Sequence, residues 1–191
     1  MKKIASLLVL SICFSQCEPV ILVWHGQSAA NFSLKNDTLE VSGVLGKKAY
    51  KRFNRLLQNH PKISTLVLLD VPGSINDEYN LKMGKRLHDA GLNTVLTSTS
   101  IIASGGVDLF LCGNERYIES NAKIGVHSWT DGKINPNELS KTDSAHHLFI
   151  DFYNDIGVDT SFYWFTLRAA PADSMHWMTT KEIQRYDIGT K

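Results

Sequence analysis

A serine and a histidine in the middle of the chain have the types and spacing of a nucleophile and its base. Ser104 lies in the stretch I-I-A-S-G-G, whose glycines leave the backbone around the hydroxyl open to a substrate. His127 ends the β-prone stretch K-I-G-V-H. A hydroxyl becomes an effective nucleophile when a base takes its proton, and an imidazole that is neutral near pH 7 suits that role. The pair predicts a hydrolase that acts on acyl groups.

Backbone donors for the developing oxyanion are also available. The P-G-S turn at 72–74 follows an apolar strand, and the glycines after Ser104 begin a helix whose first N–H groups have no partner within that helix. We expect the N–H groups of Ser74 and Gly105 to form the oxyanion hole. The substrate-binding residues expected around them are Gly73, Ile75 and Asp108.

Each of these features also has a purely structural explanation. A serine in an A-S-G-G turn is often a helix N-cap, with its hydroxyl bonded to the helix backbone. A lone histidine is often a hydrogen-bonded core residue, and P-G is an ordinary turn. The order and spacing of the three features together carry the prediction of an enzyme.

The surrounding chain alternates strand and helix patterns, which places these residues at the carboxyl ends of parallel strands. The stretch S-T-L-V-L-L-D is apolar enough for a strand buried on both faces, and Tyr50, Phe53, Leu56 and Leu57 have helical spacing. An α/β fold with right-handed crossovers follows. The expected strands are 20–24, 37–43, 64–70, 93–97 and 123–129, and the expected helices are 47–59, 79–90, a run after Ser104, 145–156, 159–169 and a short one from Thr179.

Length and charge restrict the class of function. The 191 residues suffice for one globular domain, and 43% of them are hydrophobic. Lysine and arginine number 20 against 19 acidic residues, with no basic cluster, so we expect no nucleic-acid partner. The histidines include no H-E-x-x-H pair. Neither a metal site nor a cofactor is therefore expected.

The N-terminus has the pattern of an export signal. Lys2 and Lys3 precede an apolar run that ends at Phe14 and is too short to span a bilayer. Small residues near its end suit cleavage, which predicts a signal peptide over 1–17 and a domain over 18–191, periplasmic or secreted. Lipidation at Cys17 is the one route to a membrane, although F-S-Q before it fits a lipoprotein signal poorly.

Several motifs, taken in order, resemble the ClpP/crotonase superfamily on the side of the Clp-type serine peptidases. L-V-L-L-D-V-P-G-S-I resembles that family's strand and S-P-G-G oxyanion turn, with Ser74 in place of the second glycine. I-A-S-G-G-V-D resembles its nucleophile turn, and I-G-V-H-S-W resembles its histidine strand. With F-Y-W-F-T-L-R-A-A-P and M-H-W-M-T, the set is similar to a group of exported Clp-protease-like bacterial proteins.

The resemblance implies a single α/β domain, built as a spiral of ββα units with a C-terminal helical arm. It implies a peptide or another acyl group as the substrate. It also implies a homo-oligomer formed through the arm at 145–165, whose aromatic residues outnumber what a small domain's core requires. The alternative explanation of those aromatic residues is that they form the core of the arm itself.

The third member of the triad is where the sequence departs from the family pattern. Aligning W-M-T-T-K-E-I with the family's last short helix puts Met175 where those peptidases have an aspartate. Asp173 is the nearest acid and is the expected partner of His127, with Asp155 and Asp159 as alternatives. A serine–histidine dyad oriented by a carbonyl or a tyrosine would also work, more slowly.

Two other functions share this fold. A crotonase-like enzyme would use the same amides to polarise an acyl-CoA thioester, but export argues against a cytosolic cofactor, and no pair of catalytic glutamates is evident. A non-catalytic binding or scaffold module would explain why Met175 stands in place of the acid. The sequence favours an exported, peptidase-like serine hydrolase over both.

Overall fold

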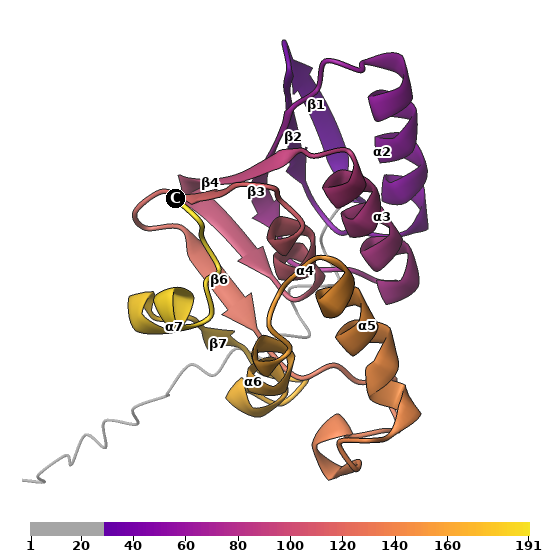
Figure 1. Ribbon diagram of the computed structural model, residues 1–191, viewed down its shortest axis with the longest axis vertical. Helices are drawn as coiled ribbons and strands as arrows, with labels where there is room; N and C mark the ends of the chain where they lie inside the picture. Colours follow the sequence, from indigo (N-terminus) through magenta and orange to yellow (C-terminus); the bar gives the residue numbers. More distant parts are fainter. Residues whose placement is uncertain (1–28) are drawn as a thin grey trace, which may run out of the picture.

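A sheet of seven strands runs through residues 29–191, the part of the chain that the computed structural model describes (Figure 1). The strand order is β1-β2-β3-β4-β6-β7, and β5 pairs with β4 beside this path. The central strands are parallel, whereas the outer strands β1 and β7 are antiparallel to their neighbours. The strands are β1 Asn31–Lys35, β2 Thr38–Ser42, β3 Thr65–Val71, β4 Asn93–Ala103, β5 Arg116–Ile118, β6 Lys123–Val126 and β7 His176–Trp177.

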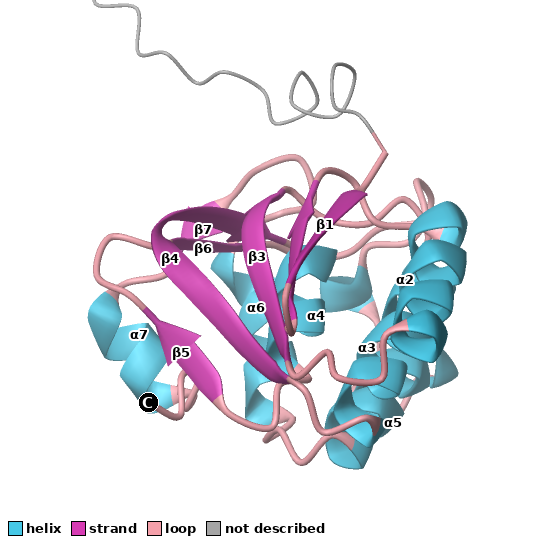
Figure 2. Cartoon of the chain, turned by 90° about the horizontal axis from the view of Figure 1, so that it is seen from above, coloured by secondary structure: helices cyan, strands magenta, loops and turns pink. Residues whose placement is uncertain are grey.

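Helices α2, α3 and α4 lie on the same side of the sheet, and α5 and α6 form an arm beyond the carboxyl ends of the strands (Figures 1 and 2). Helix α2 buries Ala49, Phe53 and Leu57, spaced four residues apart along one face. The α-helices are α2 Lys47–Asn59, α3 Asp77–Asp89, α4 Gly105–Leu111, α5 His147–Asp155, α6 Ser161–Ala169 and α7 Thr180–Arg185, with short 3-10 turns at Pro136–Glu138 and Ser144–His146.

Strand β4 is long because an irregularity lets it pair with two neighbours in turn. Its first half pairs with β5 and its second half with β6, and its register on β3 shifts between Leu68 and Asp70. At this shift the buried Ser100 hydroxyl donates to the Leu68 carbonyl at 2.6 Å and accepts from the Thr97 N–H at 2.9 Å. A side chain thereby satisfies backbone groups that the ladder leaves unpaired. The second half of β4 then leads directly to Ser104.

The α/β class and the single domain predicted from the sequence are confirmed. Helix 47–59 has the predicted limits, because Gly46 precedes it and its apolar stripe ends with it. The sequence did not predict β1, which forms a hairpin with β2 around Asn36 at φ 56°, nor the short strands β5 and β7. The signal at 1–17 and the strand at 20–24 lie outside the described residues. Within 29–191, no helix is long and apolar enough to cross a bilayer.

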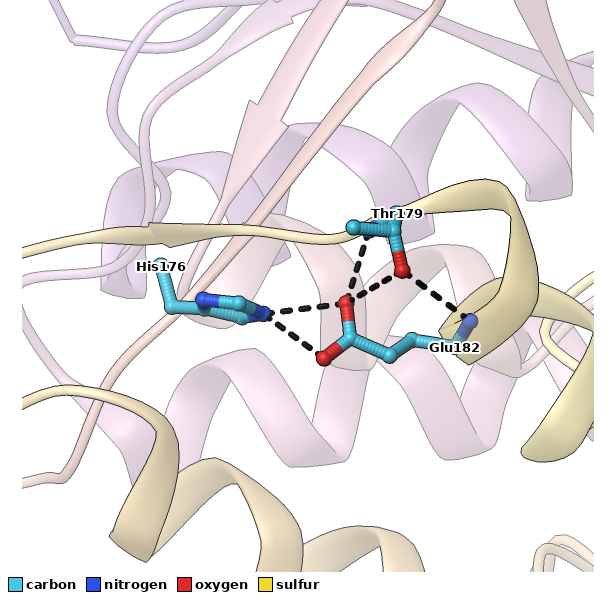
Figure 3. A network of polar contacts seen from close by, with 3 residues as sticks. All are labelled: His176, Thr179 and Glu182. Carbon is cyan, nitrogen blue, oxygen red and sulfur yellow. Dashed lines mark hydrogen bonds and ion pairs between the residues drawn. The ribbon is translucent and has the colours of Figure 1, made fainter.

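A polar network lies at the start of α7, beside β7, the strand that pairs with β6 just before His127. In β7, His176 pairs with Val126 of β6, and its Nε2 lies 3.0 Å from both carboxylate oxygens of Glu182 (Figure 3). Thr179 and Glu182 form a capping box: the Thr179 N–H donates to Glu182 Oε2 at 2.7 Å, and the Glu182 N–H donates to the Thr179 hydroxyl at 3.3 Å. These bonds lower the pKa of Glu182. Helix α7, as predicted, is capped by a threonine.

Candidate active site

Ser104 occupies a strained turn between β4 and α4. Its backbone has φ 50° and ψ −127°, a conformation that residues with a side chain rarely adopt. The Ser104 N–H donates to the Gly125 carbonyl of β6 at 3.0 Å, which ties the turn to the strand before His127. The hydroxyl makes no capping hydrogen bond to α4. The N-cap explanation of this serine therefore does not apply.

The two expected oxyanion donors lie next to each other. A Cβ atom added to Gly105 would come within 2.8 Å of Ser74 Cβ and 2.7 Å of Asn80 Nδ2, so only glycine fits there. Ser74 forms a parallel bridge with Leu45, in which the Gly73 carbonyl and the Ile75 N–H make the bonds. The Ser74 N–H therefore points away from Leu45. Within residues 29–191, neither this N–H nor that of Gly105 donates to an oxygen.

His127 follows β6 and is held in one tautomer by the backbone. Its Nδ1 lies 2.8 Å from the carbonyl of Ser128, which can only accept, so Nδ1 carries the proton. Nε2 is buried and has no hydrogen-bond partner among the described residues. In particular, it is not hydrogen-bonded to the Ser104 hydroxyl. Burial lowers the pKa of His127. A neutral imidazole with a bare Nε2 is the form required of a general base.

The structure does not bring the expected acid to this histidine. Asp173 is exposed and makes no hydrogen bond to His127, because the Ser128 carbonyl occupies Nδ1. Asp159, one of the alternatives, is also exposed and accepts from the Ser161 N–H at the start of α6. Met175 packs against Gly125 below the histidine strand. The orienting group is thus a carbonyl, the arrangement described above as the alternative to an acid.

Ser104 and His127 line one cavity of about 50 Å³ between the sheet and the arm. Asp108, one turn along α4, also lines it, and the Tyr153 hydroxyl of α5 donates to Asp108 Oδ1 at 2.6 Å. Burial raises the pKa of Asp108 to about 7, against the lowering effect of this hydrogen bond. At the rim, Asp77 accepts from the Ser74 hydroxyl at 2.5 Å.

The other two residues expected to bind substrate flank Ser74. Gly73 has φ 145°, which explains the glycine of the turn, and it is buried. The Ile75 side chain is 76% exposed and lies against Gly46. Neither residue lines the cavity, so any contact with substrate would occur outside it, on the side of the turn.

Solved structures resemble the chain, although no protein-family model and no curated protein matches it. A mutant of the 1510-N membrane-bound stomatin-specific protease has a TM-score of 0.55 at 14% identity, covering 83% of this chain and 80% of that one. Another mutant of that protease, in complex with a substrate peptide, scores 0.54 at 14% identity over 80% and 71%. An enoyl-CoA hydratase from Bacillus anthracis scores 0.49 at 10% identity over 84% and 68%.

The chain has the ClpP/crotonase fold. The fold predicted from the motifs is confirmed, and the likeness is one of fold, at identities too low to carry residue roles across. In this chain, the turn that holds Ser104 and Gly105 lies beside the turn that holds Ser74.

The sequence did not predict the wall that the arm contributes to this cavity. Phe149, Phe162 and Tyr163 line the cavity and are buried, and Trp129 lines it as well. The spacing of Phe149 and Tyr153, four residues apart, was an available signal for one inward helix face. Phe149, Phe162 and Tyr163 therefore belong to the buried core, whereas Trp164 and Phe165 are only partly buried.

Two other histidines, His146 and His176, have hydrogen-bond partners among the described residues. His146 is fully buried, and its Nδ1 lies 2.7 Å from the Tyr163 hydroxyl, which also accepts from Trp129 Nε1. His176 pairs with Glu182. Among residues 29–191, no group of three histidine, cysteine, aspartate or glutamate side chains is placed to hold a metal ion.

Proposed function

We propose that the protein is a serine hydrolase that cleaves peptide bonds, with Ser104 as the nucleophile and His127 as the base. One observation carries this proposal. A serine hydroxyl that a strained turn keeps from capping a helix lines the same cavity as a histidine whose Nε2 is unprotonated and unpartnered. Strain at a serine and an unsatisfied buried nitrogen both cost stability, and such costs concentrate at functional sites.

The reaction follows from these groups. Ser104 Oγ attacks the substrate carbonyl carbon while His127 Nε2 takes the hydroxyl proton, and the carbonyl oxygen becomes an oxyanion. The N–H groups of Ser74 and Gly105 hold that oxyanion. The C–N bond then breaks, the amine leaves with the proton from Nε2, and the acyl group remains on Oγ. A water molecule, deprotonated by His127, releases the acid and restores the serine.

The Ser128 carbonyl contributes orientation but no charge. Its bond to Nδ1–H keeps Nε2 free for the proton, as an aspartate would. A carbonyl stabilises the transient imidazolium less than a carboxylate does, so we expect slow turnover. The Ser104–Nε2 hydrogen bond would form when substrate closes the site, because such bonds are often long in ligand-free enzymes.

A fluorophosphonate probe tests the proposal. We expect it to label the parent protein and to label neither Ser104→Ala nor His127→Ala at a comparable rate. Labelling of Ser104→Ala equal to that of the parent would refute the assignment. The rate should fall only when the pH drops below the ordinary histidine pKa of about 6.5, because burial lowers the pKa of His127 and protonation removes the base.

A non-catalytic binding module of the same fold is the second candidate. Two observations within residues 29–191 favour it: no carboxylate is hydrogen-bonded to a ring nitrogen of His127, and the Ser104 hydroxyl and Nε2 are not hydrogen-bonded to each other. A folded protein that binds peptides but resists the probe would establish this function instead. Under either function we propose export directed by 1–17, to the periplasm or the exterior, with Cys17 as the point of any lipid anchor. Assembly into a homo-oligomer is likewise a proposal.

A further inference from the structure

We propose that the cavity beside Ser104 is a specificity pocket for a positively charged side chain, lysine or arginine, and that Asp108 recognises the charge. The inference rests on the proposed function, because Ser104 defines where the reacting carbonyl of a substrate lies. Asp108 follows Ser104 by about one helical turn, so it lies within reach of a long side chain next to the attacked carbonyl.

Among residues 29–191, the Asp108 carboxyl forms no ion pair with a lysine, arginine or histidine. Its Oδ1 accepts from the neutral Tyr153 hydroxyl, and of the described residues that line the cavity none is lysine or arginine. Asp77 at the rim adds a second carboxylate. Burying an acid without a counter-charge is costly, and a bound cation would remove that cost.

The remaining walls suit the other parts of a basic side chain. Val107 and Val126 are apolar surfaces for its methylene groups. Trp129, Phe149 and Tyr163 are aromatic rings, which attract cations through their electron-rich faces. The volume of about 50 Å³ is several times what one water needs, so a charged head group and part of its stem can enter.

Binding of the cation should strengthen as the pH rises. The pKa of Asp108 is about 7, so the acid is mainly neutral at pH 6 and must lose a proton to pair with a cation, whereas at pH 8 it is already ionised. The ionisable groups around it are Asp77 of α3, Cys112 of α4, His127 after β6, Tyr153 of α5 and Tyr163 of α6. Burial raises the pKa of the thiol and of both phenols, so these three stay neutral across this range, and burial lowers the pKa of the histidine, which favours its neutral form.

A binding experiment with the Ser104→Ala protein, which cannot turn over, tests the pocket without requiring catalysis. The ligands are Nα-acetyl-lysine amide and Nα-acetyl-norleucine amide, which differ by the amino group, compared by calorimetry at pH 8. We expect the lysine ligand to bind about tenfold to a hundredfold more tightly, and Asp108→Asn to abolish the difference. The matched control is Asp151→Asn, which removes the same charge from α5 outside the cavity.

Equal binding of the two ligands, or a preference that survives Asp108→Asn, would overturn the pocket. A second variant guards against a folding defect. Tyr153→Phe removes the hydroxyl that lowers the pKa of Asp108, so the lysine preference should appear at higher pH than in the parent. A purely structural Asp108 would leave that pH profile unmoved.

An acylation experiment distinguishes a failure of the proposed pocket from a failure of the proposed hydrolase activity. Thioesters of the same two amino acids are offered to the protein with Ser104 intact. Acylation of Ser104 at equal rates by both would support the hydrolase and overturn the pocket. Lysine-selective binding without any acylation or probe labelling would support the pocket and overturn the hydrolase.

Discussion

The two walls of the cavity are held in place in opposite ways. On the sheet side, Ser104 lines the cavity, and Gly105 and Ser74 lie directly behind it; together these three residues form what we call the sheet wall. The wall depends on a close approach of Gly105 to Ser74 that only the missing glycine side chain allows. The arm wall, made of Phe149, Tyr153 and Tyr163, depends on large rings that fill space, with Phe149 and Tyr163 stacked at 5.6 Å between centroids. Changes in the sheet wall should therefore damage chemistry first, and changes in the arm wall should damage stability first.

The largest expected effect concerns the arm wall. Phe149→Ala removes a buried ring that stacks on both Trp129 and Tyr163, so the free energy of unfolding should fall by roughly 3–5 kcal/mol. Leu148→Ala, the adjacent position on α5, is the control: its side chain is 48% exposed, and the loss should stay within about 0.5 kcal/mol. Urea unfolding measures both. Equal losses would mean that the arm wall is not held by packing.

In the sheet wall, we expect Gly105→Ala to reduce stability less than Phe149→Ala does and to reduce activity more. Gly105→Ala would place a methyl group against Ser74 and Asn80 and displace a proposed oxyanion donor, so probe labelling should slow by about a hundredfold. Gly157→Ala is the matched control, because Gly157 has φ 70° and no atom within 4 Å of an added Cβ. It should cost about 1–2 kcal/mol of stability and leave labelling unchanged. A Gly105→Ala protein that labels normally would contradict the oxyanion assignment.

The smallest effect separates strain from chemistry at one residue. Ser104→Gly and Ser104→Ala both lack the hydroxyl of the proposed nucleophile, but glycine tolerates φ 50° and ψ −127° and alanine does not. The glycine variant should therefore be more stable than the alanine variant by about 1 kcal/mol in urea unfolding. If the alanine variant were the more stable, the turn at Ser104 would not be strained, and the contrast between a strained sheet wall and a packed arm wall would not hold.

The sheet wall was largely predictable from the sequence, and the arm wall was not. Glycine runs and a continuous apolar strand are local signals, so the turns at Ser74 and Ser104 lie where the sequence predicted them, and the strand predicted over 123–129 begins as expected but ends at Val126. The position of the arm depends on contacts between segments far apart in the chain, such as Tyr153 with Asp108. Helical spacing showed that the arm had an apolar face, but nothing local specified what that face covers.

The partner of His127 illustrates the same limit. The sequence pattern predicts an acidic side chain as the partner of His127, and Asp173 fits because it is the acid nearest to Met175, where the Clp-type peptidases have an aspartate. The group that the structure places on Nδ1 is the carbonyl of Ser128, which every residue type possesses. Sequence patterns cannot distinguish a backbone acceptor of this kind, because its identity depends on chain direction after β6.

The Ser128 carbonyl cannot be removed by mutating a side chain, because this group, which is bonded to Nδ1 of the proposed base, belongs to a peptide unit. An alanine scan of the acidic residues would leave the orientation of His127 intact. Relatives that share this arrangement would lack a recognisable third residue, and a search requiring a serine, a histidine and an aspartate would pass over them.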